Sequence, residues 1–285
     1  MDSQKPCLIN SELFGRHATY FESAIVPLWQ EVYDSLVSRA HISEGSSVLD
    51  VGTGTGEVAL RLGRLVGQRG QVVAIDAQTE MLQIATSKAQ NQGLHNIEFK
   101  QMPMEAMALP DGSFESIVGN YSLCCCMDYK ASLAECLRVT RPGGRLTYNH
   151  TGPLDSLASQ VIFKIFEGYK TRAPSKRLKE IRASNAAQVE AVEKYRDPFV
   201  TLNLIRSLGY DEAEATVVRR VIKYKDASSF IDEWLSFDWR AEAEEIPSAD
   251  LKGFRKEVVG ALSPLSKGPK FSVASDMVFF TALKR

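Results

Sequence analysis

The chain is predicted to be an α/β protein with a doubly wound, mostly parallel sheet of seven strands, an antiparallel edge strand and a helical cap. Three observations predict this fold. Short apolar runs alternate with amphipathic segments between residues 47 and 150, which is typical of a parallel sheet covered by helices on both faces. A glycine-rich stretch follows the first apolar run. Beyond residue 150 the sequence is mostly helical, apart from two late β-rich segments.

The N-terminal part of the chain is predicted to be helical. Apolar residues such as Phe21, Ile25 and Leu36 recur at close to a helical period over residues 11–40. Proline has no backbone N–H and its ring clashes with the preceding helical turn, so Pro27 is expected to bend or interrupt this helix.

The region from residue 47 to 150 is predicted to supply five strands and three helices. The predicted strands are residues 47–51, 72–75, 96–100, 114–119 and 145–149, and the predicted helices are 57–66, 79–92 and 129–140. Before the last strand, residues 141–144 read Arg-Pro-Gly-Gly and predict a turn. Proline presets the first position of such a turn, and glycine accepts a positive φ at the next.

Residues 151–285 are predicted to form the helical cap and two closing strands. Helices are expected at 156–169, 176–183, 186–195, 228–240 and 249–262, and a further helix is expected to end at Gly209. The β-rich segments 215–224 and 271–283 are expected to pair antiparallel at the sheet edge. No internal repeat or low-complexity linker divides the sequence. We therefore expect one domain over residues 1–285, comprising N-terminal helices (1–44), a core (45–150) and the cap with its closing strands (151–285).

Composition argues against several classes of protein. Lys and Arg number 34 and Asp and Glu 35, which gives a net charge of -1 and no basic footprint for nucleic acid. No run approaches the about 20 apolar residues that span a bilayer, and the N-terminus lacks the apolar region of a secretory signal. The five cysteines do not resemble a disulfide framework. We therefore expect a cytoplasmic protein without a membrane span.

Three of the cysteines are consecutive, at positions 124, 125 and 126. Thiolates bind soft metals, but adjacent side chains point in different directions and cannot form a tetrahedral site alone. We expect small buried side chains here and no metal site.

The strongest local signal is the sequence of residues 48–57, a strand followed by a glycine-rich turn and the start of a helix. Glycines at 52, 54 and 56 allow a tight turn and a close approach of a ligand to the backbone. The first amides of the helix offer donors to an anionic group. Three alternate glycines weaken local structure without a packing return, which favours a bound ligand over a bare turn.

Two aspartates narrow the choice of ligand. Asp76 stands at the tip of the second strand, where an acid accepts hydrogen bonds from ribose hydroxyls, and NAD and S-adenosylmethionine both carry a ribose. From Gly54 the turn even matches a dinucleotide fingerprint. Asp50, inside the apolar first strand, suits an ammonium group better than a pyrophosphate. A methyltransferase is therefore favoured, while an NAD-dependent oxidoreductase and a non-catalytic cofactor-binding protein stay open.

Four segments together resemble the class I S-adenosylmethionine-dependent methyltransferases. Residues 48–57 and 72–82 look like the first two motifs, and residues 109–118 and 137–146 look like the segments before strands four and five. The set is similar to the methyltransferase-11 group, which includes the ubiquinone/menaquinone biosynthesis methyltransferases. The resemblance covers residues 45–150 and implies a Rossmann-like fold that transfers methyl groups to a small molecule.

The resemblance also implies roles for individual residues. Asp76 would hold the ribose, Met81 would pack near the adenine and Asn120 would lie close to the sulfonium. The methionyl part would be surrounded by the first motif, with Asp50, Gly52, Thr53, Gly54 and Gly56.

The chain departs from the family at one position near the adenine. Where an acidic residue commonly binds the adenine amino group, this chain has Pro103. We expect the Met104 backbone amide to lie at the adenine and Glu105 to substitute for the missing acid.

Methyl transfer from a sulfonium is an in-line displacement, to which positioning of the acceptor and exclusion of water contribute. Oxygen acceptors also need a proton removed. His150 follows the fifth strand at the ligand-binding end of the sheet, and His17 with Tyr20 is expected to fold over the pocket, so these three are the catalytic candidates. Phe230, Trp234 and Phe237 share a helical face that is either core or a platform for a partly apolar or aromatic acceptor. The acceptor atom and the oligomeric state stay open.

Overall fold

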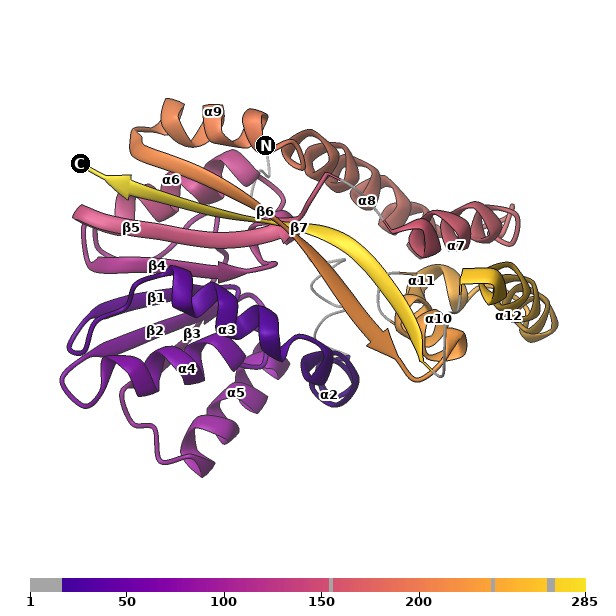
Figure 1. Cartoon of the computed structure of the whole chain (residues 1–285), viewed down its shortest axis with the longest axis horizontal. Coiled ribbons are helices and arrows are strands. Elements are labelled where there is room, and N and C mark those ends of the chain that lie inside the picture. The colour runs from indigo at the N-terminus through magenta and orange to yellow at the C-terminus, as the bar shows by residue number, and fades with distance from the viewer. Residues whose placement is uncertain (1–16, 154–155, 237–238, 266–269) are drawn as a thin grey trace.

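The computed structural model describes residues 17–153, 156–236, 239–265 and 270–285. It contains one seven-stranded sheet in the order β3-β2-β1-β4-β5-β7-β6 (Figure 1). The strands are β1 (Ser47–Val51), β2 (Gln71–Asp76), β3 (Ile97–Gln101), β4 (Phe114–Asn120), β5 (Thr140–Thr151), β6 (Tyr210–Tyr224) and β7 (Phe271–Lys284). β1 to β5 pair in parallel, and β7 pairs antiparallel with both β5 and β6. The predicted fold class is confirmed.

Helices cover both faces of the sheet, as a doubly wound fold requires (Figure 1). On one face, α3 (Gln30–Arg39) and α4 (Glu57–Val66) bury apolar side chains against β1, β2 and β4. On the other, α6 (Tyr129–Val139) and α9 (Pro198–Leu208) pack against the same sheet. The fold also contains α5 (Thr79–Asn91) between β2 and β3.

Predicted and observed boundaries agree closely in the first half of the chain, and β1 and α4 span the predicted residues. Residues 141–144 differ, since they belong to β5 instead of forming a separate turn, although Gly143 keeps the expected positive φ of +76°. Residues 176–195 form one continuous helix, α8 (Lys176–Tyr195), where two were predicted. The helix predicted at 228–240 is two helices, α10 (Ala227–Ser236) and α11 (Arg240–Ala243).

The N-terminal segment, which we define as residues 17–28, is an irregular run of helical turns. It consists of α2 (Ala18–Tyr20), a π-helical turn (Phe21–Ile25) and a 3₁₀ turn (Val26–Leu28) that contains Pro27. The proline therefore interrupts the predicted helix, and a regular α-helix resumes only with α3. The predicted helical stretch at residues 11–16 lies outside the described residues.

The cap consists of helices α7 (Leu157–Glu167), α8, α10, α11 and α12 (Ser248–Leu262). Its own apolar core joins Phe166, Phe230 and Phe254 to Phe271 of β7. β6 and β7 run without a break from the sheet into this core (Figure 1). Phe230 is a buried core residue and Trp234 packs beside it, whereas Phe237 lies outside the described residues.

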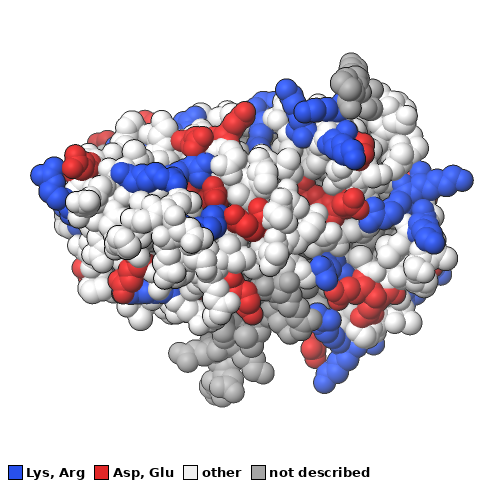
Figure 2. Space-filling view, turned by 90° about the horizontal axis from the view of Figure 1, so that it is seen from below, with Lys and Arg blue, Asp and Glu red and all other residues white. Residues whose placement is uncertain are grey.

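No helix in the described part of the chain is both long and apolar enough to cross a bilayer. Figure 2 shows basic and acidic side chains interspersed with uncharged surface over the face seen there.

Candidate active site

The turn between β1 and α4, here called the glycine turn (residues 52–56), is bonded to the end of β2. Gly52, Gly54 and Gly56 have φ values of +66°, +53° and +87°, a region that favours glycine. The Gly54 N–H donates a hydrogen bond of 2.8 Å to Oδ2 of Asp76. The turn is therefore held open toward the carboxyl ends of β1 and β2, where ligands bind in this class of sheet.

Two of the three glycines are also required by packing. A Cβ atom at Gly52 would lie 2.4 Å from Cβ of Ser122, and one at Gly56 would lie 2.8 Å from Cβ of Ala85. At Gly54 the nearest atom would be 3.9 Å away. The expectation that the glycines bring no packing return is therefore wrong for Gly52 and Gly56, and only Gly54 has space beside it.

Asp50 is almost completely buried at the end of β1. The Thr53 hydroxyl donates a 2.6 Å hydrogen bond to its Oδ2. Burial raises the pKa of Asp50 from its ordinary value of 3.8 to about 7, although the bond from Thr53 opposes the shift. An ammonium group brought to this carboxylate would favour its ionised form, which suits the methionyl end of S-adenosylmethionine.

Asp76 ends β2 on the other side of the glycine turn. Besides the Gly54 N–H, it accepts a 2.9 Å hydrogen bond from the Gln78 N–H. Burial raises the pKa of Asp76, and these backbone bonds oppose the shift. The carboxylate is thus fixed in place at a half-buried position, with each of its oxygens able to accept further bonds from ribose hydroxyls.

The residues expected near the adenine lie on two sides of the turn. Met81 is buried in α5, and Cε of Met104 lies 3.3 Å from where a Cβ of Gly52 would stand. Glu105 accepts a 2.8 Å hydrogen bond from the Met127 N–H through Oε1. This bond ties Glu105 to the loop after β4.

Asn120, expected near the sulfonium, ends β4 and belongs to a polar cluster with β5. Its Oδ1 accepts a 3.0 Å hydrogen bond from Nδ2 of buried Asn149. Asn149 Oδ1 in turn accepts a 2.9 Å bond from the N–H of Tyr121, a bulky residue with a φ of +49°. Non-glycine residues in this region carry strain and concentrate at functional sites.

Ser122 completes this cluster and was not predicted, nor were Tyr121 and Asn149. The hydroxyls of Ser122 and of Thr55 in the glycine turn are buried, with no hydrogen-bond partner among the described residues. Buried hydroxyls without partners are rare and suggest a missing polar ligand. Their positions directly after β4 and within the glycine motif were the available signal. With Asp50 and Asp76, these groups fit S-adenosylmethionine.

The N-terminal segment lies beside the glycine turn. Cε1 of Phe21 is the atom closest to the open position at Gly54. Lys88 of α5 pairs with Glu22 of the segment at 2.7 Å and with Glu57, the first residue of α4, at 2.6 Å. These half-buried contacts hold the segment over the turn.

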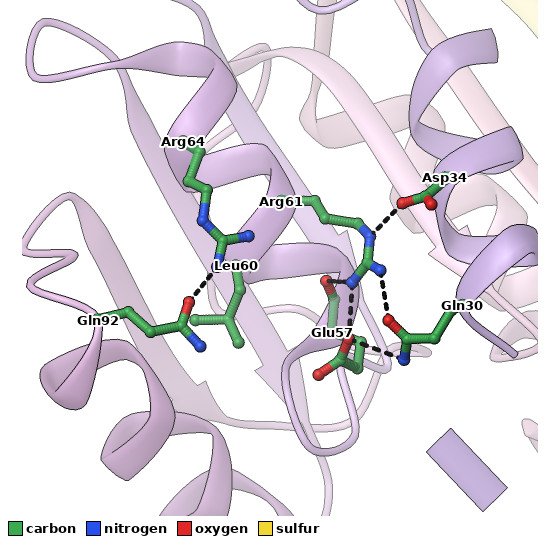
Figure 3. Close-up of a pocket in the computed structure, with 7 residues that line it drawn as sticks. All are labelled: Gln30, Asp34, Glu57, Leu60, Arg61, Arg64 and Gln92. Carbon is green, nitrogen blue, oxygen red and sulfur yellow. Dashed lines mark hydrogen bonds and ion pairs between the residues drawn. The ribbon is translucent and has the colours of Figure 1, made fainter. Parts of the chain in front are cut away.

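A polar pocket of about 300 Å³ lies on the outer side of α4, between α3 and α5 (Figure 3). Arg61 lies at its centre and binds Asp34 at 2.7 Å, Glu57 at 2.6 Å and Gln30 at 2.7 Å. The polar side chains that line the pocket bond to one another, and these contacts join α3 to α4. The residues that line it are Gln30, Asp34, Glu57, Leu60, Arg61, Arg64 and Gln92.

His150 lies at the end of β5 among aromatic rings of Tyr129, Tyr148 and Phe280. Its Nδ1 is 2.7 Å from the carbonyl oxygen of Thr151, while Nε2 is buried without a partner among the described residues. Burial lowers the pKa of His150 to about 4, so its imidazole is neutral at pH 7. Its role as a base stays a prediction.

His17 and Tyr20 lie where the N-terminal segment meets the cap. Nδ1 of His17 is 2.9 Å from Nη1 of Arg240 in α11. The Tyr20 hydroxyl bonds with Ser236 of α10, and burial raises the pKa of Tyr20. The structure therefore brings these two candidates together but packs His150 in a separate aromatic cluster.

The consecutive cysteines lie in the loop after β4 and are free thiols. Burial raises the pKa of Cys126, and a hydrogen bond between the Cys124 and Cys125 thiols, together with burial, raises that of Cys124. Raised values keep thiols protonated, which disfavours metal binding and nucleophilic attack. No group of His, Cys, Asp or Glu within the described ranges is arranged to hold a metal.

Comparison with known proteins identifies the class of enzyme. A family model described as a methyltransferase domain matches residues 42–196. The UbiE ubiquinone/menaquinone biosynthesis C-methyltransferase of Francisella tularensis subsp. novicida is 29% identical over 183 residues, 62% of this chain and 72% of that protein. The UbiE protein of Marinomonas sp. is 37% identical over 127 residues, 44% of this chain and 51% of that protein.

Solved structures agree in fold. The YcgJ protein of Bacillus subtilis has a TM-score of 0.56 at 20% identity and covers 89% of this chain and 97% of its own. A methyltransferase-like structure from Bacillus halodurans has a TM-score of 0.56 at 17% identity, covering 88% and 98%. The chain therefore belongs to the methyltransferase family that this domain defines, and it is an enzyme that uses S-adenosylmethionine as its methyl donor.

Proposed function

We propose that this enzyme methylates a small molecule bound between the N-terminal segment and the cap. One observation carries the proposal: the segment touches both the cofactor side and the cap. Phe21 lies beside Gly54 at one end, while His17 and Tyr20 contact Arg240 and Ser236 of the cap. A ligand held between these parts would be close to the glycine turn and shielded from water.

We propose the following contacts with the cofactor. Asp50, supported by Thr53, holds the ammonium, Asp76 holds the ribose, and Asn120 faces the sulfonium. The turn glycines let the ligand approach the backbone, with Met81, Met104 and Glu105 around the adenine. Ser122 and Thr55 supply the remaining hydroxyl donors.

S-adenosylmethionine supplies an electrophilic methyl group when it is bound. The chain contributes by orienting the acceptor and excluding water, which together account for a large share of catalysis in such displacements. Where the acceptor atom carries a proton, His17 or His150 receives it, and Tyr20, whose raised pKa keeps its hydroxyl protonated, orients the acceptor through a hydrogen bond. His17 is better placed for this than His150, because it lies with Tyr20 at the junction of the segment and the cap.

The cap determines the acceptor in this proposal. The family match ends at residue 196, before α10 and α12. The relatives are named C-methyltransferases of quinone biosynthesis, which makes carbon a candidate acceptor atom. The apolar side chains of the cap, such as Trp234, favour an acceptor that is partly apolar or aromatic. The nearly balanced charge favours a small molecule over nucleic acid.

We further propose one domain that works in the cytoplasm. Strand β7 contributes residues both to the apolar core of the sheet and to that of the cap, which favours a single folding unit. The four described cysteines form no disulfide, which suits a reducing compartment.

The test is to incubate the purified enzyme with S-adenosylmethionine and a metabolite extract, and to analyse products by mass spectrometry. We expect an acceptor heavier by one methylene unit and an equal amount of S-adenosylhomocysteine. Cofactor binding without any methylated product, across a broad panel of acceptors, would favour a non-catalytic binding protein and contradict the proposal.

A second test addresses the ribose contact. Asp76→Ala should weaken binding of S-adenosylhomocysteine by roughly 1–3 kcal/mol, because a charged hydrogen-bond partner is lost. Calorimetric titration measures the effect. Asp111→Ala serves as the control, since Asp111 is exposed and pairs with Arg138 away from the turn. Equal affinity of both variants would mean that the ribose lies elsewhere.

A further inference from the structure

We propose that Arg220 of β6, together with the indole N–H of Trp29, binds an anionic oxygen of the methyl acceptor. The group would be a carboxylate or a phenolate. This inference rests on the proposed function, because it concerns the same acceptor site.

Arg220 lies against the end of the N-terminal segment and forms no ion pair with a carboxylate in the described part of the chain. Its guanidinium lies 3.8 Å from the centre of the Trp29 ring, and Nη2 donates a 2.5 Å hydrogen bond to the Leu28 carbonyl oxygen. Within the described ranges, no carboxylate lies within ion-pair distance of it. A guanidinium has five N–H donors, so most of its capacity is left for a ligand.

The environment of Arg220 makes an unpaired charge unfavourable. Burial lowers the pKa of Arg220, even though the ionisable groups of Tyr121, Tyr224 and Glu233 oppose the shift. A partly buried cation is stabilised strongly only by an anion at hydrogen-bonding distance. An anionic ligand would supply this partner.

Two neighbouring polar atoms are also without partners. The Trp29 Nε1–H and Oε2 of Glu233 are buried, and neither has a hydrogen-bond partner in the described part of the chain. Native structures contain few such atoms, and several around one cation indicate a site for a polar ligand. Burial raises the pKa of Glu233, although a hydrogen bond with Tyr224 and the positive charge of Arg220 oppose the shift, so Glu233 holds a proton more readily than an exposed glutamate.

A short series of contacts connects Arg220 to the glycine turn. The Trp29 ring meets Tyr121 edge-on, with ring centres 4.6 Å apart. Tyr121 is bonded through its backbone to Asn149, and the next residue, Ser122, packs against Gly52. Trp29 and Tyr121 therefore connect the guanidinium with the neighbourhood of the glycine turn. An acceptor anchored at Arg220 would extend its reacting atom toward Asn120.

The adjacent residue provides a matched control. Arg219 lies directly before Arg220 in β6, so its side chain points to the opposite face of the sheet. The Arg219 side chain is half exposed and pairs with Asp276 at 2.9 Å. Removing either arginine changes the net charge equally, so only a specific role of Arg220 makes the two variants differ.

The experiment titrates the full-length enzyme, loaded with S-adenosylhomocysteine, with two pairs of probes. The carboxylate pair is 2-naphthoate and 2-naphthamide; the phenolate pair is 4-nitrophenolate and 4-nitroanisole. We expect the anion of at least one pair to bind about tenfold to a hundredfold more tightly than its neutral partner, as a charge-assisted hydrogen bond predicts. The pair that shows this preference identifies the chemical source of the anionic oxygen.

The variants decide whether Arg220 carries the preference. Arg220→Met should abolish it, Trp29→Phe should reduce it while keeping the ring, and Arg219→Met should leave it intact. Arg220→Lys, which keeps the charge, should retain part of it and serves if the methionine variant fails to fold. Equal binding of anionic and neutral probes, no binding of either anion, or an unchanged preference in both Arg220 variants would overturn the inference. Failure of the enzyme to bind S-adenosylhomocysteine would instead contradict the proposed function.

Discussion

Gly56 and Gly54 of the glycine turn are needed for different reasons. Gly56 combines a φ of +87° with close packing against Ala85, so a side chain there meets both backbone strain and a clash. Gly54 has a positive φ but open space, and its N–H is bonded to Asp76. Gly56 therefore serves the fold, and we propose that Gly54 serves the approach of the cofactor.

Alanine substitutions should separate these two roles. Gly56→Ala should lower the free energy of unfolding by about 2 kcal/mol or more, through strain and overpacking. Gly54→Ala should cost about 1 kcal/mol of stability but reduce cofactor affinity more strongly, because the added methyl occupies space beside the turn. Urea unfolding and calorimetric titration measure the two effects. The reverse order of stability would show that the packing at Ala85 relaxes easily.

Asp50 should make cofactor binding depend on pH. Burial raises its pKa from 3.8 to about 7, so between these values the folded chain holds a proton that the unfolded chain has released. The free energy of unfolding of the free enzyme therefore falls as pH rises through this window, and the contribution is complete only below about pH 4. In our proposal the ionised form of Asp50 binds the ammonium group, so cofactor affinity should rise from pH 5.5 to 7.5, by up to about tenfold per pH unit below the pKa.

The substitution Asp50→Asn tests this assignment. It should flatten both pH dependences and weaken cofactor binding above pH 7, where the aspartate is ionised. Titrations in buffers of different ionisation enthalpy should show proton release on binding by the native enzyme and none by the variant at pH 6.5. Identical proton release would assign the titration to another group.

At the scale of elements, the N-terminal segment is held over the turn by few contacts. The Glu22–Lys88–Glu57 contacts link it to α5 and α4, and Glu57 also pairs with Arg61. Lys88 and Arg61 together lower the pKa of Glu57, although burial opposes the shift. The segment itself is built of single helical turns, which contribute little stability of their own.

Loss of Lys88 should loosen this segment. Lys88→Ala leaves two half-buried carboxylates near each other without their shared cation, and we expect S-adenosylhomocysteine to dissociate several-fold faster. Stopped-flow displacement measures the rate. Glu44→Ala is the control, because its pair with Arg69 is largely exposed and does not involve the N-terminal segment. An unchanged dissociation rate would show that the segment does not control cofactor exchange.

The elements that the sequence predicts well are those with strong local patterns. β1 ends just before the glycine turn and α4 begins just after it. The turn therefore marks one boundary of each element within the local sequence. The local sequence near residue 184 does not show whether one helix or two form there. The structure has one helix, α8, across this position. Residues 141–144 lie within β5 at an irregularity of its pairing with β4, between the paired residues Thr140 and Arg145, and a local turn signal cannot reveal that the strand continues through them.

The candidate site shows the same division. Asp50, Asp76 and the glycines belong to one contiguous motif and its expected partner strand, so they were predictable. Arg220 contacts Leu28, which lies 192 positions away, and Asn149 contacts Asn120 across neighbouring strands. Such polar contacts depend on the assembled fold, and no periodicity or composition marks them beforehand.

At the scale of the whole molecule, the sheet and the cap have separate apolar cores joined by β7. Phe271 and Val273 at its start lie in the cap core, while Val278, Phe280 and Ala282 lie in the core of the sheet. A continuous strand shared by two cores transmits the loss of one to the other. We therefore infer cooperative folding of the two parts.

Calorimetry should show one unfolding transition. Phe254→Ala, which removes a fully buried ring from the cap core, should lower the single transition temperature without splitting the peak. S-adenosylhomocysteine should raise this single temperature by mass action, because it binds the folded chain and not the unfolded one. Two separate peaks, only one of them shifted by the ligand, would divide the chain into independent units.

The continuity of β6 and β7 also limits how the enzyme can open. The two paired strands run from the sheet to the cap, and the backbone hydrogen bonds between them make this pair resist bending. A swinging cap would have to break that ladder, whereas displacement of the N-terminal segment disturbs only a few side-chain contacts. Substrate should therefore enter and product should leave beneath the N-terminal segment. The rates of entry and release should depend on the strength of those few side-chain contacts.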